Sequence, residues 1–237
     1  MKQNGLFDFD DQVNYKTQTD PSPEPGKMGV QDDFPEIPKL HELCVDAYFS
    51  VIYAWMSELP IKKEIGRYID KIIQNGADRT SAARTAFDRG DQDVITVLGA
   101  AYKVQREIHR LLGLLRFTLN SGGIYTARCA PDHYILPAMA EHFTLRFGET
   151  PWAIIDEKRN ICLIKNKNEE VQLMNIPACF AANNEQSGAT GGCTGSDAWE
   201  DLWRLYHKSV NNEARKNLTL QRQFMPVRYQ KYLTELN

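Results

Sequence analysis

A continuous apolar stripe at helical spacing runs through residues 92–115, and it constrains the fold more than any other feature of this sequence. Its members are Val94, Val97, Leu98, Ala101, Val104, Ile108, Leu111, Leu112 and Leu115. Residues three and four apart share one face of a helix, so this spacing predicts a long amphipathic helix. We expect this helix to run from about Gln92 to Leu115 and to form the spine of the core.

The opposite face of this helix combines bases with residues that lack side chains. Gly99, Lys103, Arg106, Arg110 and Gly113 follow one another at intervals of four, three, four and three. A phosphate backbone could approach such a surface closely, because glycine carries no Cβ. The alternative is that another helix crosses at the glycines while the bases extend into solvent. Both interpretations stay open from the sequence.

Shorter helices are predicted before the spine. Apolar residues recur at helical spacing between Pro38 and Pro60, which predicts one helix over residues 38–59. A second helix is expected over residues 61–75, and a short third helix follows it. Asp78 and Asp91 are positioned as N-caps of the short helix and of the spine.

After residue 115 the hydrophobic period changes from helical to strand-like. We expect strands over residues 116–119, 124–129, 152–156, 161–164 and 170–174, paired as hairpins. Pro131-Asp132 is expected to start a helix that ends near Gly148. The pattern predicts an α+β fold, in which an amino-terminal helical bundle packs on a small antiparallel sheet with flanking helices.

Charge is distributed unevenly along the chain. Residues 1–37 carry eight acids against three lysines, and residues 202–237 carry seven bases against two acids. The proline-rich, acidic residues 1–37 are expected to be a disordered leader, because they bury too little surface to offset the entropy of ordering. Residues 38–115 form the expected helical region, and residues 116–237 the α+β region of the same compact unit. The basic carboxyl-terminal end favours a polyanionic partner.

The cysteines and the hydropathy indicate the compartment. Five cysteines are widely spread without a C-x-x-C pair, so neither a disulfide framework nor a zinc knuckle is predicted. No apolar run approaches the roughly 20 residues of a membrane span, and Met1–Asp11 is acidic where a signal peptide is basic and then apolar. We expect a cytoplasmic protein with no membrane partner.

The carboxyl-terminal end combines bases with aromatic residues. Residues 187–196 are glycine-rich and lack the lysine of a phosphate-binding loop. Asp197 is expected to cap a helix with an apolar stripe of Trp199, Leu202, Trp203, Tyr206 and Val210, opposite Arg204, Lys208 and Arg215. Beyond it, Phe224 and Met225 are expected to pack into the core, while bases such as Arg215, Arg222 and Arg228 contact phosphates.

A polar cluster is expected between the spine helix and the sheet, and it holds the candidates for chemistry. Its members are Glu107, His109, Arg110, Arg116, Asp132, His133, His142 and Arg146. Asp132, His133 and His142 could ligate a metal, but neighbouring residues diverge in direction and no helical i, i+4 ligand pair exists. We expect no metal and no cofactor, with Asp132 acting as a helix cap and Glu107 pairing with Arg110 or Arg146.

Several short motifs resemble a bacterial family of DNA-metabolism proteins. They are residues 107–117 (EIHRLLGLLRF), 131–137 (PDHYILP), His142-Phe143 with Arg146-Phe147, residues 152–159 and residues 224–229 (FMPVRY). Members of that family occur as partners of a radical-SAM DNA-repair enzyme, and related domains are fused to uracil-DNA-glycosylase-like domains. The resemblance implies DNA repair or modification as the context, without specifying a reaction. The acidic leader, the glycine-rich insertion and Gln230 depart from the family pattern.

The resemblance and the residues together give three hypotheses. The first is a DNA-binding accessory protein of a repair or base-modification system. Its candidate phosphate ligands are Lys103, Arg106, Arg110, Arg116, Arg146, Arg159, Arg215, Arg222 and Arg228. The second is an enzyme acting on a base or its glycosidic bond. Its candidate catalytic residues are Glu107, His109, Asp132, His133, His142 and Asp156. The third is a protein-binding subunit of a DNA-processing complex.

Overall fold

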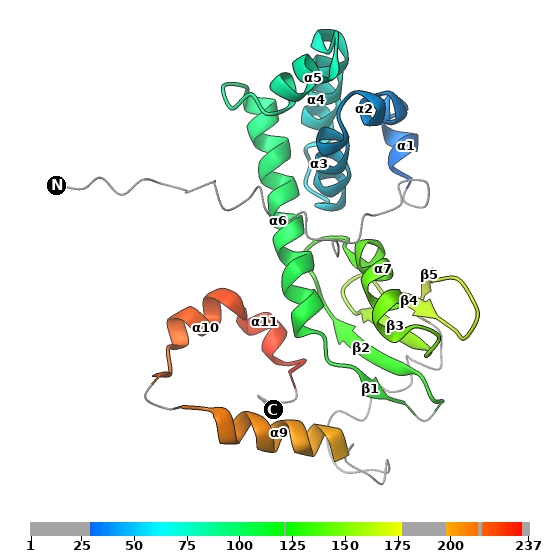
Figure 1. Cartoon of the computed structure of the whole chain (residues 1–237), viewed down its shortest axis with the longest axis vertical. Helices are drawn as coiled ribbons and strands as arrows, with labels where there is room; N and C mark the ends of the chain where they lie inside the picture. Colours follow the sequence, from blue (N-terminus) through cyan, green and yellow to red (C-terminus); the bar gives the residue numbers. More distant parts are fainter. Residues whose placement is uncertain (1–28, 121, 177–197, 213–214, 234–237) are drawn as a thin grey trace, which may run out of the picture.

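The computed structural model describes residues 29–120, 122–176, 198–212 and 215–233 (Figure 1). Within the range expected as leader, Val30, Phe34 and Ile37 recur at helical spacing and are buried in the core. Residues 1–28, the glycine-rich stretch 187–196 and Asp197 lie outside the described ranges.

The amino-terminal region is a bundle around one long helix. Its elements are α1 (Val30–Asp33), α2 (Ile37–Leu43), α3 (Val45–Met56), α4 (Lys62–Asn75), α5 (Arg79–Ala86) and α6 (Gln92–Leu114). The single helix expected over residues 38–59 is instead two helices, because Cys44 is extended (φ −152°, ψ 101°) and separates α2 from α3. Both predicted caps are confirmed: the side chain of Asp78 accepts from Ser81 N, and that of Asp91 begins α6.

Helix α6 is the spine that the sequence predicts. Its apolar stripe is buried, and α3 and α4 pack along its amino-terminal half (Figure 1). Its carboxyl-terminal half reaches past the bundle to the sheet, where α7 (Leu136–Phe147) contacts it. Helix α6 therefore packs against both the helical bundle and the layer that contains the sheet.

The sheet is mixed, whereas an antiparallel sheet was expected. The strands β1 (Thr118–Leu119), β2 (Tyr125–Cys129), β3 (Trp152–Asp156), β4 (Ile161–Lys165) and β5 (Gln172–Asn175) follow one another in order. The hairpins β1–β2 and β3–β4 are confirmed as antiparallel, but β2 and β3 pair in parallel through the crossover helix α7. The fold is α+β as predicted, with one βαβ unit between two hairpins.

Alternation along β3 builds a core on both faces of the sheet. Trp152 and Ile154 join the main cluster with α6 and α7, whereas Ala153 and Ile155 form a second cluster on the other face. Every residue of β3 is buried. The sheet is thereby fixed against the bundle, and the loops at its edge are held at one place relative to α6.

In the described ranges after the sheet, the helices are α9 (Ala198–Val210), α10 (Leu218–Phe224) and α11 (Val227–Gln230). Figure 1 shows α10 beside the carboxyl-terminal half of α6 and α9 below the end of α6, both away from the bundle. Phe224 is 64% exposed, so the expectation that it packs into the core is wrong, and Tyr229 of α11 is the aromatic residue that enters the core. No helix in the described ranges is long and apolar enough to cross a membrane.

Candidate functional site

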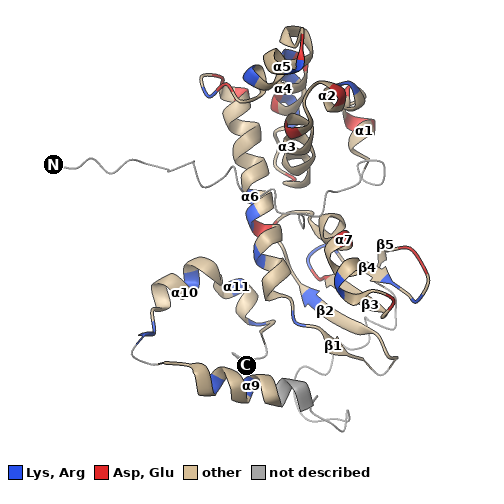
Figure 2. Ribbon diagram, in the orientation of Figure 1, with Lys and Arg blue, Asp and Glu red and all other residues tan. Residues whose placement is uncertain are grey.

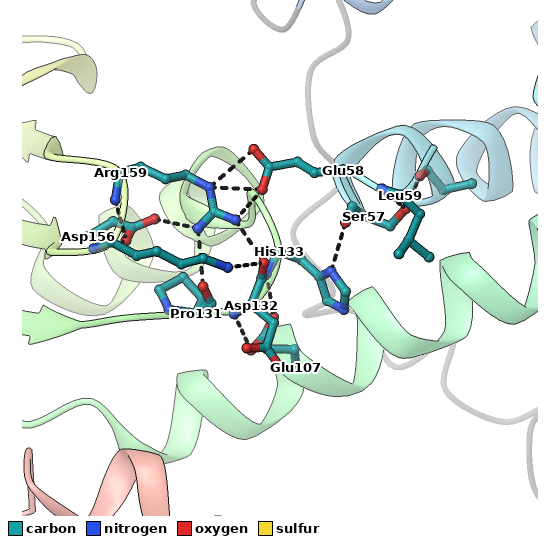
Figure 3. Close-up of polar contacts among 11 residues, drawn as sticks. Ser57, Glu58, Leu59, Glu107, Pro131, Asp132, His133, Asp156 and Arg159 are labelled. Atoms are coloured by element: carbon teal, nitrogen blue, oxygen red, sulfur yellow. Dashed lines mark hydrogen bonds and ion pairs between the residues drawn. The ribbon is translucent and has the colours of Figure 1, made fainter. Parts of the chain in front are cut away.

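The loop that joins β2 to α7 is where polar contacts from distant segments converge (Figure 3). Glu107, on the buried face of α6, accepts hydrogen bonds from two backbone N–H groups of this loop. Its Oε1 lies 2.8 Å from Asp132 N and its Oε2 lies 2.9 Å from His133 N. Glu107 is only 3% exposed, and these two charge-assisted bonds compensate for the burial of its carboxylate.

The end of α3 holds the same loop from the bundle side. Tyr134 N donates to Met56 O at 2.9 Å, and His133 Nδ1 lies 3.0 Å from Ser57 O. The Ser57 carbonyl therefore orients the His133 ring, which is half-buried between the bundle and the sheet.

The β3–β4 turn supplies an ion pair beneath the loop. Asp156 is fully buried and accepts from Lys158 N at 2.9 Å and from Arg159 Nη1 at 2.8 Å. Arg159 also donates to Pro131 O at 3.1 Å and to Asp132 O at 2.8 Å, and it pairs with Glu58 beyond α3. One guanidinium thus bridges the sheet, the loop and the bundle.

Helix α11 closes the arrangement from the carboxyl-terminal end. Arg228 Nη2 donates to Glu107 Oε1 at 3.2 Å, and the Tyr229 hydroxyl donates to the same oxygen. Arg228 also forms an ion pair with Asp132. Burial, reinforced by the bond to Glu107, raises the pKa of Tyr229, so its hydroxyl stays protonated as a donor. We call Glu58, Glu107, Asp132, His133, Asp156, Arg159, Arg228 and Tyr229 the polar junction.

Two expectations about the polar junction are wrong. Asp132 does not cap α7, because that helix begins four residues later with Ile135 as its N-cap, and the Asp132 side chain pairs with Arg228 instead. Glu107 pairs with Arg228 and neither with Arg110 nor with Arg146. Arg110 and Arg146 are closer to Glu107 in sequence than Arg228 is. The fold nevertheless brings α11, which carries Arg228, into contact with α6.

The structure brings together four of the six catalytic candidates. Glu107, Asp132, His133 and Asp156 meet in the polar junction. His109 is on the exposed face of α6, and His142 lies on α7 with its ring 5.0 Å from that of Phe143. Burial, together with Arg146, lowers the pKa of His142 and keeps its ring neutral near pH 7. Within the described ranges, no group of three His, Cys, Asp or Glu residues could hold a metal ion.

The nine candidate phosphate ligands divide into those with structural contacts and those on the surface. Arg159 and Arg228 belong to the polar junction. Arg116 Nη1 donates to Gly113 O at 2.9 Å at the end of α6, and Arg110 Nη2 donates to Gln223 O at 3.2 Å. The exposed candidates are Lys103, Arg106, Arg146, Arg215 and Arg222.

The exposed face of α6 carries the residues that the sequence marks as a phosphate-binding pattern. Lys103 and Arg106 form no ion pair with any described residue. No described atom lies within 4 Å of a Cβ added at Gly99 or Gly113, so no helix crosses at these glycines. The crossing-helix alternative is therefore excluded for the described part of the chain.

Aromatic rings that sequence reasoning missed lie among these bases. The Arg106 guanidinium lies 5.5 Å from the ring centroid of Tyr102, a contact that the i, i+4 spacing could have indicated. Trp203 and Tyr206 of α9 were expected in an apolar stripe, yet they are 40% and 54% exposed. Arg116 lies 5.8 Å from the ring of Trp203, which places α9 beside α6.

We call these residues the basic–aromatic surface. It comprises Tyr102, Lys103 and Arg106 of α6, Trp203 and Tyr206 of α9, and Arg222 and Phe224 of α10. In Figure 2, Lys and Arg recur along the lower half of α6 and on α9 and α10. Arg110 of α6 donates to the backbone of α10, and Arg116, just after α6, lies over the Trp203 ring of α9.

One family model matches the chain, over residues 63–235, and its description is a domain of unknown function, DUF4130. This range begins in α4 and covers the polar junction, apart from Glu58, and the whole basic–aromatic surface. No curated protein and no solved structure matches the chain.

Proposed function

The chain belongs to the DUF4130 family, and we propose that it is a DNA-binding accessory protein of a DNA repair or base-modification system. The observation that carries this proposal is the exposed basic face of α6. Lys103 and Arg106 are unpaired among the described residues, and the flanking glycines leave the surface accessible to a phosphate backbone. Neutralising phosphates releases condensed counterions, which favours binding without a specific base contact.

The polar junction supports an accessory role over an enzymatic one. Both oxygens of the Glu107 carboxylate accept hydrogen bonds from the loop, and Asp156 is fully buried in bonds to its own turn and to Arg159. A general base needs an oxygen within reach of a substrate proton. These carboxylates are already engaged in holding the loop, so we interpret them as structural.

Charge reversal on α6 tests the proposal. A variant with Lys103→Glu and Arg106→Glu should bind duplex and single-stranded DNA about tenfold more weakly or worse, as measured by fluorescence anisotropy. The matched control is Lys63→Glu with Arg84→Glu, which changes the net charge equally on exposed positions of α4 and α5. Equal affinities for the two variants would count against α6 as the DNA-binding face.

A second observation favours a protein-binding role as an alternative. Helices α9 and α10 expose Leu202, Leu205, Val210, Leu218 and Leu220, each at 50% or more. Exposed apolar patches of this kind mark interaction sites. Affinity capture with the wild-type chain, compared with a Leu202→Asp, Leu205→Asp variant, tests this role, and equal recovery of partners by both would remove it.

We propose DNA repair or base modification as the common context of both roles, as the family resemblance implies. The partners that it implies are a radical-SAM DNA-repair enzyme or a uracil-DNA-glycosylase-like protein, and these stay part of the proposal. A cytoplasmic location is also proposed, and it agrees with the burial of Cys44, Cys129 and Cys162 as thiols rather than disulfides.

A further inference from the structure

Two exposed aromatic rings stand side by side on α9. Trp203 is 40% exposed and Tyr206 is 54% exposed, and their ring centroids are 5.7 Å apart with an interplanar angle of 31°. Large rings normally bury their area in a core or an interface. Rings that keep half of their surface in water offer flat apolar faces to a ligand.

A base lies beside one of these rings. The Arg116 guanidinium, two residues after the end of α6, lies 5.8 Å from the Trp203 ring centroid. Arg110 donates to the backbone of α10 at Gln223 O, and the neighbouring Arg222 and Phe224 of α10 are exposed. The basic–aromatic surface therefore combines exposed rings with positive charges.

We propose that the basic–aromatic surface binds single-stranded DNA, with bases stacked on Trp203 and Tyr206 and phosphates held by Lys103, Arg106 and Arg222. This inference rests on the proposed DNA-binding function and adds the class of nucleic acid. In a duplex the faces of the bases are covered by their neighbours, whereas in a single strand they are free to stack on protein rings. Duplex DNA would engage the bases of this surface but leave its rings unused.

The pairing of rings with bases suits a nucleic-acid strand, which offers base faces and phosphates together. On this surface a cation lies over or beside the rings of Tyr102 and Trp203. Each pair presents a ring face and a positive charge together, as a base with its phosphate requires.

The first experiment compares three probes of equal length: oligothymidylate, a fully abasic strand and a duplex. The abasic strand carries the same phosphates without bases. Fluorescence anisotropy should show the intact chain binding oligothymidylate about tenfold or more tightly than either other probe. Equal binding of the abasic strand and oligothymidylate would overturn the stacking inference while leaving DNA binding intact. Absence of binding to all three probes would overturn both.

Variants of α9 locate the stacking. Trp203→Ala and Tyr206→Ala should each weaken oligothymidylate binding by about fivefold or more, and Trp203→Phe should retain most of the affinity. All three should bind the abasic strand as the wild type does, which shows that the phosphate contacts remain. Leu205→Ala, at a 64% exposed position of the same helix, is the control and should bind normally. A loss with Leu205→Ala equal to that with Trp203→Ala would overturn the assignment.

Discussion

At the scale of single residues, the structure depends on buried charges with assigned partners. Asp156 has no exposed surface, and its compensation comes from the amides of its own turn and from Arg159. A buried carboxylate that loses its cation keeps the cost of desolvation without the Coulombic gain. The fold should therefore lose more stability when one partner of a buried ion pair in the polar junction is replaced than when both partners are replaced.

Arg159→Met should lower the free energy of unfolding by about 3–5 kcal/mol, because it leaves Asp156 charged in the core. Adding Asp156→Asn to this variant should restore part of the loss. Urea denaturation measures both changes. Arg146→Met, at an exposed position of α7, is the control and should change stability by less than about 0.5 kcal/mol. A cost for Arg159→Met no larger than that of the control would contradict the structural role of the pair.

A second charge network predicts how stability depends on pH. Asp93 accepts from Arg67 at 2.7 Å and from Lys71 at 2.8 Å, and these bonds hold the pKa of Asp93 well below its usual range. The bond from Lys71 also lowers the pKa of Asp91. A carboxyl with a lower pKa in the folded state stabilises the fold above its unfolded pKa of about 4, and this contribution is lost as pH falls further.

The Asp93→Asn variant should therefore be less stable than the wild type at pH 7, and the difference should shrink as pH falls below about 4. Thermal or urea unfolding across that range measures the difference. If the difference in stability between wild type and variant stays constant down to about pH 3, the ionisation of Asp93 does not cause the pH dependence of stability.

At the scale of elements, α6 links the sequence pattern to the candidate surface. Its buried stripe packs on the bundle and on α7, whereas on its outer face no described atom lies within 4 Å of a Cβ added at Gly99 or Gly113. Glycine inside a helix costs stability relative to alanine. The fold does not need these glycines, so they are consistent with a ligand that approaches the helix closely.

Gly99→Ala should raise the free energy of unfolding by about 1 kcal/mol, because nothing described obstructs the added Cβ. Gly148→Ala provides the contrast, since Gly148 has φ +58° at the end of α7 and a side chain there is strained. Urea denaturation should move in opposite directions for the two variants. A loss of stability with Gly99→Ala would show that this face of α6 is covered.

The elements that the sequence predicted well are those with a long or regular period. The stripe of α6, the caps Asp78 and Asp91, and the two hairpins depend on neighbours along the chain, and all are confirmed. The parallel pairing of β2 with β3 and the contact of Arg228 with Glu107 join segments far apart. Local periodicity carries no information about such pairs, so the sheet topology and half of the polar junction could not be predicted.

The candidate site shows the same division between local and distant contacts. Of the six catalytic candidates predicted from the sequence, Glu107, Asp132, His133 and Asp156 lie together in the structure, whereas His109 and His142 lie apart from them. No sequence signal indicated Glu58, which reaches Arg159 only because α3 ends against the β3–β4 turn. The exposure of Trp203 and Tyr206 was also missed. The spacing of an apolar stripe does not show whether that face of the helix is buried or exposed to solvent.

At the scale of the whole molecule, contacts between distant segments connect the elements to α6. The polar junction ties the bundle, the sheet and α11 to α6, Arg110 donates to α10, and Arg116, just after α6, contacts Trp203 of α9. The basic–aromatic surface therefore combines residues that are far apart in sequence. The central claim is that this surface binds DNA through phosphate contacts.

The salt dependence of DNA affinity tests this claim most directly. The affinity of the intact chain for oligothymidylate should be measured between about 50 and about 200 mM salt, in parallel with the Lys103→Glu, Arg106→Glu variant. The account predicts that the logarithm of the affinity falls linearly with the logarithm of salt concentration. The slope for the variant should be shallower by about 1.4, that is, about 0.7 for each lost phosphate contact on a single strand. An affinity that does not change with salt, or equal slopes for the two proteins, would contradict it.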